Sequence, residues 1–285
     1  EGRGRLATRS LTPGPLESYR PAMTNISPRI DAAVQSAIDQ RRLVGAVIAV
    51  MQDGSLAHLK AYGLSDREAG APMKPDSLFR LASISKPIVT AAAMRMIELS
   101  KLSLDATVTD WLPDFKPRIP DGSTPTITIR HLLTHTAGLA YDFMPPESAP
   151  YNRLKASAGA DGDLPMEENL ARMVEAGLVF PPGAAWLYSV AIDVLGAVMT
   201  NAEGAHLEEV VKRYVTGPLA MNDTSFFVTD AARLVQPYSN AAPEPIRIGD
   251  GHRQAFVPML APINMSVSRA FNRNAFQGGG GCMNG

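Results

Sequence analysis

A serine and a lysine stand three residues apart in the stretch LASISKPIVT, which covers residues 81–90. Residues at this spacing share one face of a helix, so the side chains of Ser83 and Lys86 can touch. A serine hydroxyl becomes a strong nucleophile only when a neighbouring base takes its proton, and lysine can be that base where burial disfavours the ammonium form. The spacing therefore predicts nucleophilic chemistry at Ser83, although a capping serine beside a solvated lysine has the same pattern.

The residues that follow predict the helix that holds this pair. Apolar residues recur at positions i, i+3, i+4 and i+7 up to about Leu99, namely Val89, Ala92, Ala93 and Met96. Pro87 fits only in the first turn, where its missing N–H has no intrahelical partner to lose. Ser83 is therefore expected at the helix N-terminus, where free N–H groups and the helix dipole stabilise an oxyanion.

The composition limits the classes of function. The chain has 285 residues, of which 45% are hydrophobic and 19% charged, so it has ample material for a core. A net charge of −1 with scattered basic residues lacks the footprint of a nucleic-acid binder. The single cysteine, Cys282, rules out an internal disulfide framework. No apolar run reaches the ~20 residues of a membrane span, and no signal peptide is evident, so we expect a cytoplasmic protein. The sequence does not indicate which oligomeric state the protein has.

The N-terminal half predicts a short leader, a helix and a hairpin. Met23 resembles a natural start, so residues 1–22 are interpreted as a leader or added segment and 23–285 as one domain. Ser27-Pro28 is typical of a helix start. Residues 44–51 form a short apolar run rich in Val and Ile, Asp53-Gly54 supplies a turn, and residues 56–63 follow, which together predict a β-hairpin.

The rest of the chain predicts a mainly helical body. A short helix is expected after Thr128, closed by Gly138, with further helices at about 166–177 and directly after Ser189. Residues 141–165 are rich in Pro, Gly and Ala and are expected to form a surface excursion, and the C-terminal residues FQGGGGCMNG a glycine-rich loop. The elements together predict an α/β protein.

Three strings resemble the serine β-lactamase-like enzymes, in the branch of class C β-lactamases, penicillin-binding proteins and family VIII esterases. They are LFRLASISKPIVTAAAMRMIELSKLSLDATVTDWLPDF, ITIRHLLTHTAGL and PPGAAWLYSVAIDVLGAV. The resemblance is closest to the family VIII carboxylesterases. It implies a β-lactamase/transpeptidase-like fold, with an antiparallel sheet beside a mainly helical region. The family's last sheet strands, with their K-T-G-like or W-G-G-like element and second oxyanion N–H, follow the point where this chain stops, so the domain is expected to be C-terminally incomplete.

The resemblance also implies roles for individual residues. Tyr188 matches the family's catalytic tyrosine, which faces the serine and lysine, whereas Tyr151 in the loop-rich excursion is a weaker rival. We assign Trp186 and Val190 to substrate binding. The β-lactamases of the family have an asparagine where this chain has Val190, and a valine offers no amide to a lactam side chain, which favours an apolar ester pocket.

Other motifs do not predict competing chemistry. His131 and His135 have the two-histidine spacing of a zinc-protease helix, but Leu132 replaces the required glutamate, so a structural role is expected. The glycine run 278–281 lacks the lysine of a phosphate loop, and the chain has no G-x-S-x-G. No metal or cofactor is predicted.

The sequence therefore predicts a serine hydrolase that cleaves short- to medium-chain carboxylic esters of small molecules through an acyl-enzyme on Ser83. A β-lactamase, a D-aminopeptidase or an acyltransferase of the same fold remains an alternative. A non-catalytic binding relative is the alternative from a different class.

Overall fold

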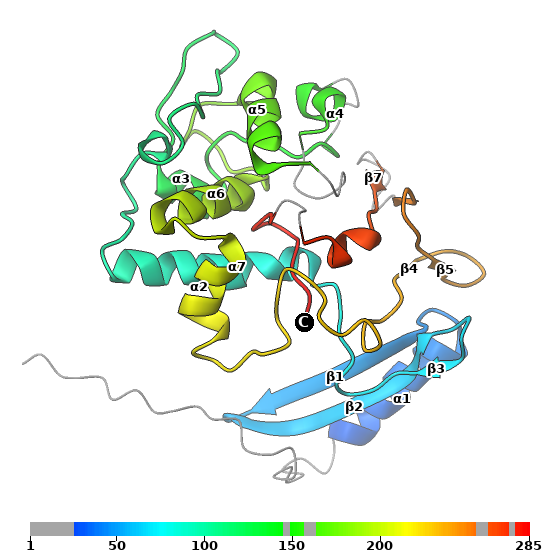
Figure 1. The fold of residues 1–285 in the computed structure, drawn as a ribbon. Coiled ribbons are helices and arrows are strands. Elements are labelled where there is room, and N and C mark those ends of the chain that lie inside the picture. The colour runs from blue at the N-terminus through cyan, green and yellow to red at the C-terminus, as the bar shows by residue number, and fades with distance from the viewer. Residues whose placement is uncertain (1–25, 145–148, 157–163, 255–261, 274–276) are drawn as a thin grey trace, which may run out of the picture.

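A computed structural model describes residues 26–144, 149–156, 164–254, 262–273 and 277–285. The predicted leader, residues 1–22, lies outside the described residues. Figure 1 shows a small sheet with one helix at one side of the molecule and the remaining helices at the other. None of the helices in the described ranges has the length and apolar character that crossing a membrane requires.

The predicted hairpin is confirmed as the main part of the sheet. Strands β1 (Gly45–Gln52) and β2 (Ser55–Asp66) pair antiparallel, and the short β3 (Ala71–Pro72) adds a third strand beside β2. Asp53 and Gly54 both have positive φ, at 49° and 77°, as a type I′ turn requires. The turn chemistry therefore fixes the register of the two long strands.

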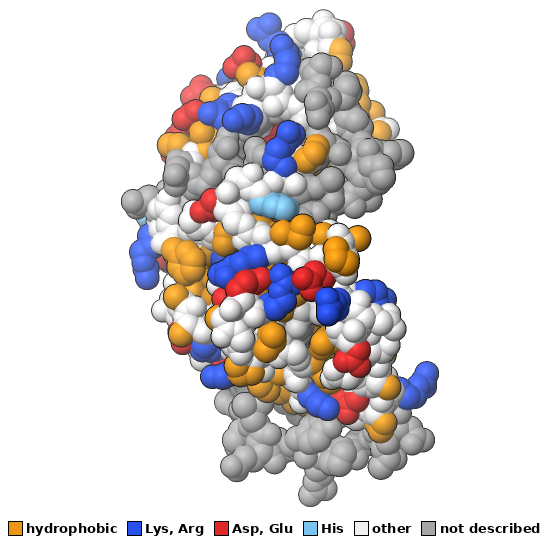
Figure 2. Space-filling model, turned by 90° about the vertical axis from the view of Figure 1, so that its right-hand side faces the viewer, with side chains coloured by type: hydrophobic (Ala, Val, Ile, Leu, Met, Phe, Trp, Pro, Cys, Tyr) orange, Lys and Arg blue, Asp and Glu red, His pale blue; other side chains and the backbone are white. Residues whose placement is uncertain are grey.

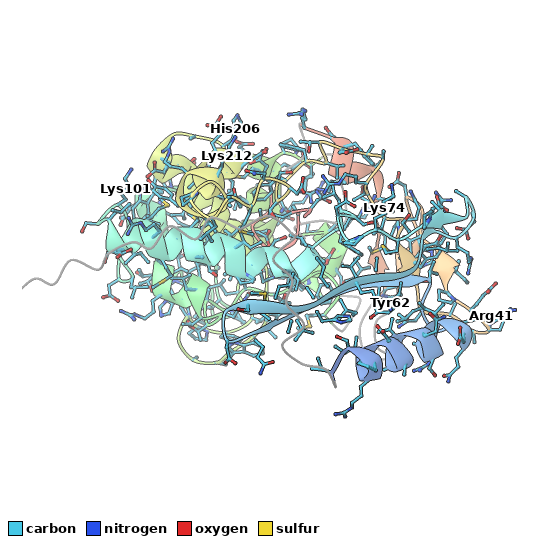
Figure 3. The ribbon with its side chains drawn as sticks, turned by 90° about the horizontal axis from the view of Figure 1, so that it is seen from below. Arg41, Tyr62, Lys74, Lys101, His206 and Lys212 are labelled. Atoms are coloured by element: carbon cyan, nitrogen blue, oxygen red, sulfur yellow. The ribbon has the colours of Figure 1, made fainter. Side chains whose placement is uncertain are left out.

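Helix α1 (Ile26–Asp39) lies along one face of this sheet, as the view from below shows (Figure 3). A partly buried polar contact joins the two elements, because the hydroxyl of Tyr62 on β2 donates to Asp31 on α1 at 2.6 Å. The same hydroxyl lies 3.0 Å from Nε2 of His58, whose other ring nitrogen contacts Ser27 at 3.0 Å. These contacts fix α1 on the sheet.

The helical body contains α2 (Ser85–Glu98), α3 (Ile129–Leu133), α4 (Pro150–Leu154), α5 (Met166–Ala176), α6 (Ala191–Glu203) and α7 (Leu207–Val211). The predicted face of α2 is confirmed, because Val89, Ala92, Ala93 and Met96 are all fully buried. Helix α6 packs against α2, α3 and α7, and every residue of its first nine is buried. It is the centre of the core, and its N-terminus lies behind the segment that carries Tyr188.

Two predicted elements differ from the structure. The helix after Thr128 ends at Leu133, before Gly138, because the chain turns into the left-handed region at His135 (φ 55°). The excursion at 141–165 is not confined to the surface. Tyr151 on α4 is buried, and its hydroxyl donates to the carbonyl of Gly177 at 2.9 Å, where α4 packs on α5. Proline and glycine content predicted a loop but not this anchoring side chain.

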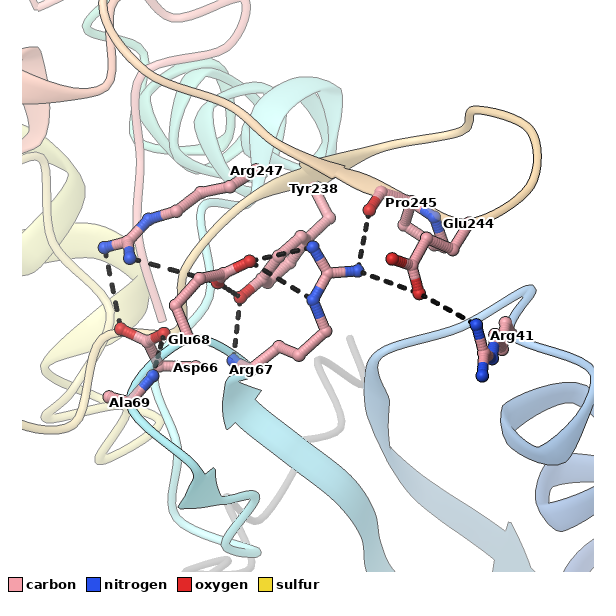
Figure 4. Close-up of polar contacts among 9 residues, drawn as sticks. All are labelled: Arg41, Asp66, Arg67, Glu68, Ala69, Tyr238, Glu244, Pro245 and Arg247. Carbon is pink, nitrogen blue, oxygen red and sulfur yellow. Dashed lines mark hydrogen bonds and ion pairs between the residues drawn. The ribbon is translucent and has the colours of Figure 1, made fainter.

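A second short hairpin, β4 (Tyr238–Ser239) with β5 (Ile246–Arg247), is attached to the end of β2. The guanidinium of Arg67 donates to the carbonyl of Pro245, and the backbone N–H of Arg67 donates to the Tyr238 hydroxyl, both at 2.8 Å (Figure 4).

Acidic and basic side chains are interspersed over the face shown in Figure 2. Two further strands, β6 (Arg253–Gln254) and β7 (Ile263–Asn264), pair with each other.

The last residues of the chain pair with the segment that leads to Ser83. The N–H of Leu81 donates to Met283 at 2.9 Å, and the N–H of Phe79 donates to Gly285 at 2.8 Å. The glycine-rich end predicted as a loop is therefore bonded into the interior. It lies beside the N-terminus of α2.

The α1–sheet contact leads to a stability prediction. Tyr62→Phe removes two hydrogen bonds from a buried hydroxyl, so we expect the free energy of unfolding to fall by about 1–2 kcal/mol. Lys60→Met removes an ion pair to the same Asp31 between half-exposed side chains and is expected to change it by less than ~0.5 kcal/mol. Urea denaturation measures both. A larger loss in the lysine variant would contradict this account of the interface.

Candidate active site

Ser83 lies in a single turn of 3-10 helix, Ala82–Ile84, immediately before α2. Ala82 has a φ of 45°, a conformation that is unfavourable for a residue with a side chain. The hydroxyl of the buried Ser85 stabilises this turn, because it donates to the carbonyl of Ala82 at 2.7 Å and accepts from the N–H of Met283 at 3.0 Å. The Ser83 side chain is exposed as a result.

Lys86 extends from the first turn of α2 and is 7% exposed. Its Nζ donates to Oγ of Ser83 at 3.2 Å and to the carbonyl of Gly280 at 2.5 Å. The ammonium also lies 4.6 Å from the ring centre of Tyr188 and 5.5 Å from that of Tyr141. No carboxylate of the described ranges forms an ion pair with it, so a hydroxyl, a carbonyl and two aromatic rings surround this charge.

Tyr188 completes the predicted group of three. Its hydroxyl donates to Oγ of Ser83 at 2.8 Å, so both the lysine and the tyrosine contact the serine oxygen. The backbone positions Tyr188 through its neighbours, because the N–H of Leu187 donates to the carbonyl of His135 at 2.9 Å. The structure therefore brings the three residues together from two distant parts of the chain.

His135 supports the tyrosine and is not placed as a metal ligand. Its ring lies 5.0 Å from that of Tyr188, and its Nδ1 accepts the N–H of Ser189 at 3.3 Å. Burial, with the nearby charge of Lys86, lowers the pKa of His135 to about 4, so the ring is neutral at pH 7 and can accept this bond. His131 caps its own helix instead, since its Nδ1 accepts the N–H of Thr128. The described residues contain no cluster of His, Cys, Asp and Glu suited to a metal.

The two residues assigned to substrate binding lie in different environments. Trp186 is 65% exposed and touches His135 edge-on at 6.3 Å between ring centres. Val190 has no exposed surface, because it is the N-cap residue of α6 and its side chain turns into the core. The contact of Val190 with substrate stays a prediction. The sequence could not show on which side of the entering chain the valine would lie.

The structure adds three residues that the sequence did not single out for this site. Tyr141 lies against Tyr188 with 5.5 Å between ring centres, Gly280 accepts from Lys86, and Asp193 accepts from Gly280. A signal for Asp193 was present, since it is the only charged residue in the otherwise apolar run AIDVLGAVM. Gly280 lies in the glycine run, which the sequence predicted only as a loop.

Comparison with known proteins identifies the family. Residues 30–281 match the family described as Beta-lactamase. The chain belongs to this family. Esterase EstB of Burkholderia gladioli is 45% identical over 266 residues, which cover 92% of this chain and 67% of EstB. The solved structure of EstCE1, a hydrolase with promiscuous acyltransferase activity, has a TM-score of 0.88 at 42% identity and covers 90% of this chain and 68% of EstCE1.

A more distant relative carries out acyl transfer. Monacolin J acid methylbutanoyltransferase of Aspergillus terreus is 29% identical over 248 residues, which are 78% of this chain and 58% of that enzyme. The chain thus spans about two thirds of EstB and EstCE1 and less of the transferase. These matches confirm the predicted β-lactamase/transpeptidase-like fold and the resemblance to esterases of this family.

The geometry gives a direct prediction for Tyr188. Tyr188→Phe keeps the ring and removes the hydroxyl that contacts Ser83, so ester turnover should fall by about 10²–10⁴ while thermal stability is retained. Tyr151→Phe is the comparison, because the Tyr151 hydroxyl donates to the backbone at Gly177 and does not contact Ser83, so turnover should fall far less than in Tyr188→Phe. Steady-state kinetics measures the effect of each variant on turnover, and thermal unfolding measures its effect on stability. Loss of turnover in the Tyr151 variant alone would reverse the assignment.

Proposed function

We propose that this chain hydrolyses carboxylic esters of small molecules through an acyl-enzyme on Ser83. The observation that supports the proposal most strongly is the convergence of Lys86 and Tyr188 on the Ser83 oxygen, at 3.2 and 2.8 Å. Both contacts are within the range over which a proton can pass between heteroatoms. The esterase names of EstB and EstCE1 support the same reaction.

In the first step, Tyr188 reacts as the phenolate and takes the proton of Ser83 as Oγ attacks the ester carbonyl carbon. The ammonium of Lys86 stabilises the negative charge of that phenolate before the transfer and the charge on the serine oxygen during it. The N–H of Ser83, at the N-terminus of α2, binds the oxyanion. The alkoxide then leaves and takes that proton from Tyr188. In the second half of the reaction, water attacks the acyl-enzyme and gives its proton to Tyr188, and the acid is released as Ser83 takes the proton back.

The acyl group of the proposed substrate is apolar. A cavity of about 920 Å³ lies behind Tyr141 and Leu187, the residue before Tyr188, and its lining is mostly aliphatic and aromatic. Ser83 is not part of that lining, and the Tyr141 ring lies between the cavity and Tyr188. We infer that short- to medium-chain acyl groups extend past Tyr141 into this space. A volume of this size is typical of small-molecule sites.

Acyl transfer is the second candidate function. EstCE1 is described as having promiscuous acyltransferase activity, and the Aspergillus terreus relative is named a transferase. An acyl-enzyme on Ser83 serves both reactions, because an alcohol can replace water in the second step. Product analysis with an added primary alcohol separates hydrolysis from transfer.

The proposal predicts the class of substrate. A short-chain nitrophenyl ester should have a kcat/KM at least about ten- to a hundredfold above that of a chromogenic cephalosporin, since position 190 is a fully buried valine and offers no amide to a lactam side chain. Ser83→Ala should abolish both activities. Ser85→Ala should lower stability and leave the reaction at Ser83, because Ser85 is buried and bonded to Ala82 and Met283. A wild-type preference for the cephalosporin would overturn the esterase assignment.

The cavity predicts a change in chain-length preference. Val174 on α5 lines the cavity, so Val174→Trp should lower kcat/KM for an octanoyl ester by about tenfold and spare the acetyl ester. Leu99→Trp, at an exposed position outside the lining, is the control. If Val174→Trp changes kcat/KM for the octanoyl and acetyl esters by the same factor, the cavity is excluded as the acyl site.

A further inference from the structure

Asp193 is a carboxylate buried without a full set of partners. It lies in the first turn of α6 with no exposed surface. Its Oδ1 accepts the N–H of Gly280 at 2.8 Å, whereas Oδ2 has no hydrogen-bond partner in the described structure. Burial is the main cause that raises its pKa to about 6. An aliphatic residue would suit this core better for stability alone, so the carboxylate requires another explanation.

Gly280 connects this carboxylate to the proposed active site. Its N–H donates to Asp193, and its carbonyl accepts from Nζ of Lys86. A Cβ at position 280 would lie 2.4 Å from Oδ2 of Asp193, and one at Gly279 would lie 2.5 Å from the carbonyl of Ile192. The glycine run therefore allows the chain to lie directly against the N-terminus of α6. This contact gives a physical role to the motif that the sequence left unassigned.

We propose that Asp193 is a positioning residue, which holds Gly280 so that the Gly280 carbonyl fixes the ammonium of Lys86 beside Ser83. The inference rests on the proposed function, because Lys86 is the group whose place it sets. Lys86 has three donors, and Ser83 and Gly280 are the two acceptors that orient it. Displacement of Gly280 therefore moves the ammonium relative to the reacting oxygen.

The charge of Asp193 also acts on the site. The groups that interact electrostatically with it are Lys86 on α2, Arg269 on Ser268–Phe271, Tyr141 and Cys282. The cations Lys86 and Arg269 favour the ionised form of the Asp193 carboxylate. Loss of the charge should move the acidic limb of the pH–rate profile to lower pH, because a negative charge beside the site favours the protonated form of the site.

Two variants separate the position of Gly280 from the charge of Asp193. Asp193→Asn keeps the size and an acceptor oxygen and removes the charge. Gly280→Ala keeps the charge and forces the backbone away from Oδ2. Gly281→Ala is the matched control, because its Cβ would meet nothing closer than 3.8 Å. The measurements are the rate of Ser83 labelling by a fluorophosphonate, kcat and KM for a nitrophenyl ester from pH 5 to 9, and thermal unfolding.

We expect Gly280→Ala to lower both the labelling rate and kcat by about tenfold to a hundredfold, with KM changed much less and Gly281→Ala unchanged. Asp193→Asn should move the acidic limb to lower pH, and Gly280→Ala should not. If Asp193→Asn does not fold, the comparison of Gly280→Ala with Gly281→Ala decides whether the position of Gly280 matters for the reaction at Ser83.

Variants that label and turn over like the wild type, or that lose activity only in proportion to unfolding, would overturn the positioning role and leave the proposed function intact. A wild-type chain that Ser83-directed reagents do not label would overturn both.

Discussion

The ammonium of Lys86 is the group around which this site is built, because its charge is buried without a contacting carboxylate among the described residues. A buried charge needs compensation, and here a carbonyl, a hydroxyl and two aromatic rings supply it. These partners come from Gly280, Ser83, Tyr141 and Tyr188. Four separate parts of the chain must therefore pack correctly before the serine and lysine can act together.

The local backbone shows the cost of that arrangement. Ala82 is held at positive φ directly before Ser83, and the buried hydroxyl of Ser85 stabilises the strained turn from within the core. The glycine-rich end lies against α6 so closely that a methyl group at Gly280 would clash with Asp193. A strained residue, Ala82, and an unpaired polar atom, Oδ2 of Asp193, thus lie beside the proposed chemistry.

Sequence reasoning succeeded where the information is local. The S-x-x-K spacing and the apolar face of α2 place Ser83 and Lys86 without further knowledge, and Asp53-Gly54 fixes the hairpin. Tyr188 required the family resemblance, because it lies 105 positions along the chain from Ser83 and no periodicity links them. The contact of Gly280 with Asp193 was beyond reach for the same reason. The burial of the Val190 side chain was also beyond reach, because the side-chain direction at a helix N-cap depends on how the chain enters the helix.

The central claim is that Ser83 carries the acyl group, and one measurement tests it most directly. The chain is mixed with a slowly hydrolysed ester, quenched with acid within the first turnover, digested and analysed by tandem mass spectrometry. The account predicts one acyl adduct, on the Ser83 hydroxyl, in the wild type and none in Ser83→Ala. An adduct on another residue, or ester turnover that persists in Ser83→Ala, would contradict it.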